Sequence, residues 1–89
     1  MSPSAKLRMV RVVLHWAWDP IGVRGILEAV DEYDSYASAV LQMLESGASD
    51  RQIADYLTSI VRDWMELPPN PKADEHITEM LRELYLIVE

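Results

Sequence analysis

Residues 49–71 read SDRQIADYLTSIVRDWMELPPNP and hold two helix starts with a break between them. Ser49 and Gln52 have the spacing of a capping box, in which each side chain bonds the backbone of the other residue at the first turn of a helix. The apolar residues that follow recur at helical spacing and predict a helix over about 50–66, with a core face made of Ile53, Leu57, Ile60, Val61 and Trp64. Two prolines then break the chain, and Asn70-Pro71 supplies the cap and the first residue of another helix.

The same apolar spacing predicts helices on both sides of this stretch. The last helix is expected over about 71–88, along the stripe Ile77, Met80, Leu81, Leu84, Tyr85 and Val88. Toward the N-terminus, a helix over about 34–46 is stopped by Gly47, because glycine accepts the left-handed backbone that ends many helices. The first helix is expected over about 3–17 and is ended by Pro20, since the residue before a proline disfavours helical geometry.

Together these patterns predict an all-α fold, a small four-helix bundle-like single domain over residues 1–89, with a long connector between the first two helices. No segment has a convincing alternation of apolar and polar residues of the kind that marks a β-strand. A hydrophobic share of 49% is enough for one small core. There is no cysteine, no signal-peptide pattern and no apolar run near the roughly 20 residues of a membrane span, so we expect a soluble cytoplasmic protein.

The net charge of −7 is distributed unevenly along the chain. Residues 1–24 hold four basic residues and one acidic residue, a net charge of +3, whereas residues 25–89 hold four basic and fourteen acidic residues, a net charge of −10. An acidic body repels phosphate backbones, so direct nucleic-acid binding is disfavoured and a basic protein partner is favoured. The simpler alternative is that the acidity keeps a small protein soluble.

The connector, residues 18–34, combines aromatic and acidic residues. Tryptophan and tyrosine are enriched in protein interfaces, and carboxylates beside aromatic rings would engage an arginine-rich partner through charge and stacking. We therefore expect a partner-binding patch made of Trp18, Asp19, Glu28, Asp31, Glu32, Tyr33 and Asp34. The alternative for Trp18 is a plug that closes one end of the bundle. The other two tryptophans, Trp16 and Trp64, are expected in the core.

The connector carboxylates could also hold a hard cation such as Mg²⁺ or Ca²⁺, but the fixed offsets of an EF-hand loop are missing, and acids at a helix start already favour the helix dipole. His15 and His76 lack the spacing of a zinc site. Ser35, Ser38 and Thr78 carry hydroxyl groups, yet nothing in the sequence pairs them with a base. We therefore assign no catalytic residue, no metal site and no cofactor.

Four segments, in this order, resemble a group of small bacterial proteins of uncharacterised function: Trp18-Asp19-Pro20-Ile21-Gly22-Val23, Asp31-Glu32-Tyr33-Asp34-Ser35-Tyr36, Leu44-Glu45-Ser46-Gly47-Ala48-Ser49 and Ile53-Ala54-Asp55-Tyr56-Leu57. The resemblance covers roughly residues 12–65 and implies a compact helical fold and a bacterial origin, without established catalytic residues or cofactors. Members of that group often end soon after the equivalent of Met65, whereas here a proline-rich turn and a further helix follow. By analogy, small acidic proteins of this kind suggest toxin-neutralising immunity proteins.

We expect a non-enzymatic acidic protein-binding module, in its most concrete form an inhibitor or immunity-type protein that masks a basic surface of its partner. One alternative is a nucleic-acid-mimicking inhibitor encoded by a phage or plasmid, with carboxylates on more than one face, including Glu75, Glu79 and Glu83. The other alternative is a small metal-dependent enzyme. A homodimer fits all three, because a small core gains from a partner subunit and the first helix is apolar on more than one side.

Overall fold

The computed structural model describes residues 5–19, 22 and 33–88, and this part of the chain is helical, with no β-strand. Two of the helices continue directly into a five-residue π-helical turn, labelled η. In chain order the elements are α1 (Ala5–Val13), η1 (Leu14–Trp18), α2 (Asp34–Glu45), α3 (Asp50–Ser59), η3 (Ile60–Trp64) and α4 (Pro71–Ile87). The predicted all-α fold is confirmed.

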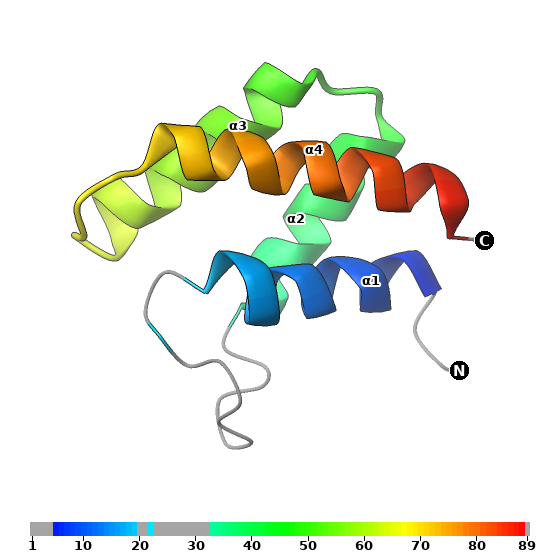
Figure 1. Cartoon of the computed structure of the whole chain (residues 1–89), viewed down its shortest axis with the longest axis horizontal. Helices are drawn as coiled ribbons and strands as arrows, with labels where there is room; N and C mark the ends of the chain where they lie inside the picture. Colours follow the sequence, from blue (N-terminus) through cyan, green and yellow to red (C-terminus); the bar gives the residue numbers. More distant parts are fainter. Residues whose placement is uncertain (1–4, 20–21, 23–32, 89) are drawn as a thin grey trace.

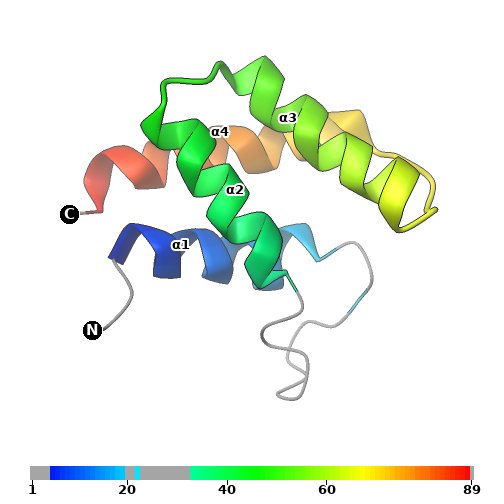
Figure 2. The same cartoon turned by 180° about the vertical axis from the view of Figure 1, so that it is seen from behind.

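The helices form two layers, with α1 and α4 in one layer and α2 and α3 in the other (Figures 1 and 2). The molecule is accordingly flat, measuring 34 × 31 × 17 Å along its principal axes. The main packing partners are α3 with α4 and α1 with α2, and α1 also contacts α4. Between the first turn of α1 and the last turn of α4, the Lys6 ammonium sits 3.8 Å from the centre of the Tyr85 ring and joins the two helices.

The helix starts predicted around residues 49 and 70 are confirmed. The Ser49 hydroxyl accepts a hydrogen bond from the Gln52 backbone N–H at 3.1 Å, and the Gln52 side chain accepts one from the Ser49 N–H at 2.9 Å. At the start of α4, the Asn70 side chain accepts a hydrogen bond from the Ala73 N–H at 3.2 Å. These bonds satisfy N–H groups that have no partner within the helix.

The predicted end of α2 at Gly47 is also confirmed. Gly47 has a φ of +81°, a left-handed conformation that costs little without a Cβ atom. Its N–H donates to the Leu44 carbonyl at 3.3 Å, and the Ala48 N–H donates to the Met43 carbonyl at 2.9 Å. This pair of bonds is the Schellman motif, which satisfies carbonyls of the last helical turn.

The capping box predicts a measurable stability difference between two serines. Replacing Ser49 with alanine should lower the free energy of unfolding by about 1 kcal/mol, which corresponds to a fall in Tm of about 4–8 °C for a chain of this size. Ser46 is the matched control, because its hydroxyl is exposed and donates only to the Met43 carbonyl, and Ser46→Ala should change little. Thermal unfolding followed by circular dichroism tests this. Equal effects at the two positions would contradict the role assigned to the box.

The core lies where the two layers meet, and its fully buried large side chains include Leu14, Ile53, Leu57, Ile60 and Leu81. The predicted burial is wrong for three side chains. Trp16 is 52% exposed, Trp64 is 79% exposed, and Met80 is also exposed. For Trp64 the physical reason is local. The π-helical turn η3 has more residues per turn than an α-helix, so Trp64 is displaced from the face that Leu57 and Ile60 present to the core.

Candidate functional site

The aromatic residue at the end of η1, Trp18, is buried with 9% of its surface exposed. Its indole Nε1–H donates a hydrogen bond to Oδ1 of Asp74 on α4 at 3.0 Å. The ring packs edge-on against Tyr33, with centroids 5.2 Å apart, and against Tyr36, with centroids 6.2 Å apart. Trp18 is therefore the plug of the alternative prediction and closes the bundle between η1, α2 and α4.

Asp74 is a buried carboxylate in the first turns of α4, with 3% of the residue exposed. Its second oxygen, Oδ2, accepts a hydrogen bond from the Thr58 hydroxyl on α3 at 2.8 Å. The side chain thus joins η1, α3 and α4 at one point. Burial raises the pKa of Asp74 above its usual range, and the hydrogen bonds from Thr58 and Trp18 act in the opposite direction.

Tyr33, the residue before α2, is buried as well, and its hydroxyl donates to Oδ1 of Asp19 at 3.0 Å. Asp19 ends η1 in a left-handed conformation, with a φ of +35°, and its N–H donates to the Leu14 carbonyl at 2.9 Å. The structure therefore corrects the expectation that Trp18 and Tyr33 offer their rings to a partner. The helix continues one residue further than expected, through a wider turn, and Trp18 reaches the interior.

The rest of the predicted connector patch is only partly within the described residues. Asp34 accepts a bond from Nε of Arg11 at 2.8 Å, an ion pair between α2 and α1. Glu28, Asp31 and Glu32 lie outside the described residues. Both Asp34 and Asp19 thus have partners within the chain.

Sequence reasoning missed Asp74, although a signal was present. Asp74 lies three residues before Ile77 and seven before Leu81, and so falls on the apolar stripe predicted for the last helix. A carboxylate on such a stripe is rarely buried without a partner. The position of Asp74 on this stripe therefore predicts hydrogen-bond donors on neighbouring helices.

A hollow of about 310 Å³ lies beside the turn that joins η3 to α4, and is called here the α3–α4 hollow. It is lined by Val61, Leu67, Pro68, Asn70 and Asp74. Val61, Leu67 and Pro68 are apolar, and Asp74 is the one acidic residue among the described residues of this lining. The end of η3 carries the exposed side chains of Asp63 and Trp64, and the turn after it carries that of Glu66.

The candidate metal-ligating and hydroxyl residues of the sequence have these positions in the described part of the chain. Within these ranges no group of three or more histidine, aspartate or glutamate side chains is placed to hold a metal ion. His15 is buried and packs edge-on against Trp16, with ring centroids 5.1 Å apart, while His76 is exposed on α4. The Thr78 hydroxyl donates to the Asp74 backbone carbonyl at 2.8 Å. In the described part of the chain, no helix is long and apolar enough to cross a membrane.

Comparison of the chain with models of protein families, with curated proteins and with solved structures found no match. The resemblance to small bacterial proteins therefore stays a prediction.

Proposed function

We propose that this protein is a non-enzymatic binding module for a basic partner protein, and that the α3–α4 hollow receives a lysine or arginine side chain of that partner. The observation that carries the proposal is the environment of Asp74. This buried carboxylate contacts two neutral donors, Trp18 and Thr58, and the described residues give it no cationic partner. A buried charge without a counter-charge is costly, and a cation entering the hollow would offset that cost.

The hydrogen-bonding capacity of Asp74 supports this proposal. Each carboxylate oxygen can accept about two hydrogen bonds, and each oxygen of Asp74 has one side-chain donor in the structure. One acceptor site on each oxygen is therefore left for a guanidinium or ammonium group. A charge-assisted bond of this kind is about twice as strong as a neutral one.

The surroundings of the hollow suit a long cationic side chain. The apolar residues Val61, Leu67 and Pro68 can pack against the aliphatic stem, which lysine and arginine bury while the charged head stays polar. Exposed Trp64 on the preceding turn offers a face on which a guanidinium can stack. The surrounding negative charge would speed the approach of a basic surface, as expected for an inhibitor or immunity-type protein.

The proposal predicts that the protein binds a single arginine side chain. The probe is N-acetyl-arginine methylamide, and the readout is the indole N–H resonance of Trp18 in ¹H–¹⁵N spectra, because this N–H bonds Asp74 directly. We expect saturable shifts at millimolar probe concentrations, the range of about −4 kcal/mol in binding free energy. The neutral citrulline analogue should give no saturable shift, and Asp74→Asn should abolish the response to arginine. Equal shifts with citrulline, or in the Asn variant, would refute the assignment.

One observation favours the nucleic-acid mimic as a second candidate function. Glu75, Glu79 and Glu83 are all exposed on α4, and a carboxylate row is what such a mimic would present. This candidate predicts that duplex DNA displaces the basic partner and that Glu75→Gln with Glu79→Gln weakens capture more than Asp74→Asn does. The reverse order of effects would favour the α3–α4 hollow.

A further inference from the structure

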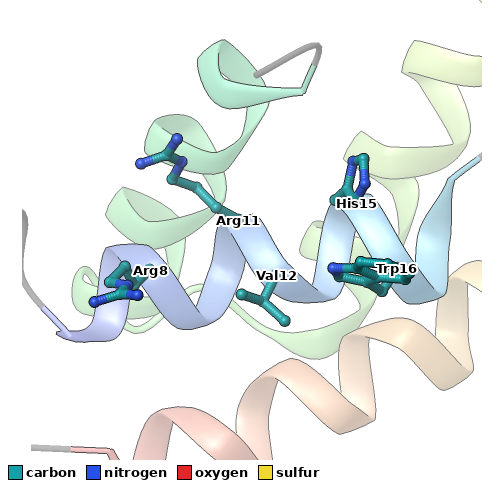
Figure 3. A pocket seen from close by; sticks show the side chains of 5 residues that line it. All are labelled: Arg8, Arg11, Val12, His15 and Trp16. Carbon is teal, nitrogen blue, oxygen red and sulfur yellow. The ribbon is translucent and has the colours of Figure 1, made fainter. Parts of the chain in front are cut away.

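Three exposed side chains, Arg8 and Val12 on α1 and Trp16 on the π-helical turn η1 that continues it, form a row in which each is four residues from the next. Val12 is 54% exposed and Trp16 is 52% exposed. Figure 3 shows their side chains following one another along one side of the helix. With Arg11 and His15 they line a hollow of about 260 Å³. This row is called here the α1 row.

The opposite side of the helix that carries the α1 row is buried in the core. Val10, Val13 and Leu14 are buried against the rest of the bundle, whereas Val12 and Trp16 leave large apolar surfaces in water. The Trp16 ring is also held in place by its edge-on contact with His15. A rigid aromatic side chain loses little conformational entropy on binding, which suits it to an interface.

The α1 row is complementary to itself. Val12 is at its centre, with Arg8 four residues before it, about 6 Å along the axis from the α-helical rise of 1.5 Å per residue, and Trp16 four residues after it in η1. When two such rows pair antiparallel about Val12, each Arg8 therefore lies opposite the Trp16 of the other copy. A guanidinium over an indole ring is the strongest common form of cation–π contact.

We infer that α1 forms a symmetric antiparallel interface with a second copy of this chain, centred on Val12, with Arg8 of each copy stacked on Trp16 of the other. A two-fold interface of this kind is closed and stops at a dimer. This interface uses a different helix from the α3–α4 hollow. A test of the dimer is therefore independent of a test of the proposed function.

The charges near the α1 row are compatible with this pairing. Arg11, which flanks Val12, is already paired with Asp34 of its own chain. The two copies of Arg8 would lie about 12 Å apart along the helix axes, beyond the screening length of about 8 Å at physiological salt. The two acidic bodies still repel each other, so added salt should strengthen the dimer. Docking of the basic α1 row on the acidic surface of another copy would instead weaken with salt.

Sedimentation velocity on the full chain at concentrations up to hundreds of micromolar tests the interface. We expect a monomer–dimer equilibrium that tightens as sodium chloride is added. Val12→Glu should raise the dimer Kd at least about tenfold, because it places the two new carboxylates face to face at the two-fold axis of the dimer. Leu86→Glu is the matched control, since Leu86 is exposed on α4 outside the row, and it should leave the Kd unchanged.

A residue swap checks the predicted register. Trp16→Arg alone should weaken the dimer, because it places the Arg8 of each copy opposite an arginine of the other. Arg8→Trp is then added to it. The double variant should recover the wild-type Kd, since each arginine again faces a tryptophan. Circular dichroism confirms that every variant is folded. A chain that stays monomeric, a dimer that weakens with salt, or a dimer that Leu86→Glu disrupts as strongly as Val12→Glu would overturn the inference.

Discussion

Trp18→Ala is expected to cost about 3–5 kcal/mol of unfolding free energy, the range for removing a buried aromatic side chain. The variant loses the packing against Tyr33 and Tyr36 and leaves a buried carboxylate without one of its two side-chain donors. Because small domains have about 5–15 kcal/mol of total stability, this change should unfold a large fraction of the protein or lower its Tm strongly. Urea unfolding followed by far-ultraviolet circular dichroism measures the effect without relying on tryptophan fluorescence.

The chain contains its own controls for this experiment. Trp16→Ala and Trp64→Ala remove the same side chain from exposed positions and should each change the unfolding free energy by about 0.5 kcal/mol or less. Trp18→Phe keeps most of the ring but removes the N–H donor, and so separates the hydrogen bond to Asp74 from the packing. A loss for Trp18→Ala no larger than that for Trp64→Ala would contradict the central position assigned to Trp18.

Replacing Asp74 should have the second largest effect on the free energy of unfolding, and the size of the effect depends on the replacement. Asp74→Ala removes the acceptor of Trp18 and Thr58 and should cost about 2–4 kcal/mol, since each buried donor left without a partner costs about 1–3 kcal/mol. Asp74→Asn keeps one oxygen for the Trp18 N–H, and its amide can donate to the Thr58 hydroxyl. It also removes a buried charge, so at neutral pH it should be close to neutral in its effect on stability.

The pKa of Asp74 predicts a pH dependence with a definite sign. Burial raises this pKa in the folded state above its unfolded value, so the folded protein binds this proton more tightly than the unfolded chain does. The stabilising contribution of the protonated group is therefore complete below the unfolded pKa and is lost as pH rises through the folded pKa. The unfolding free energy of wild type minus that of Asp74→Asn should fall with rising pH across this window. A difference that stays flat or rises would contradict the raised pKa.

The same carboxylate links stability to the proposed function. A charge that is costly in the free protein and is compensated by a ligand is a common feature of functional sites, where local rules of stability are broken. If a cation of the partner pairs with Asp74, saturating arginine probe should stabilise the wild-type fold and leave the Asp74→Asn variant unchanged. Together, the unfolding and binding experiments distinguish a carboxylate that only supports Trp18 from one that also receives a ligand.

Local interactions explain which parts of the fold could be predicted. The capping box at Ser49, the Asn70-Pro71 start and the stop at Gly47 all depend on residues within a few positions of one another, and each is found as expected. The all-α class also follows from apolar spacing, because a period near 3.6 residues is a property of the chain segment itself. The acidic side chains of Glu75, Glu79 and Glu83 were likewise placed correctly on the outside of α4.

Apolar spacing and capping residues therefore specify the helices and most of their ends, whereas long-range packing selects the tryptophan that is buried. Trp16 and Trp64, which were expected in the core, are exposed, whereas Trp18, which was expected in the connector, is buried. Two π-helical turns, η1 and η3, change the rotation per residue where these side chains lie, so a 3.6-residue period loses phase there. The burial of Asp74 depends on donors from Thr58 and Trp18, which are far away in the sequence and meet it only when three elements pack together.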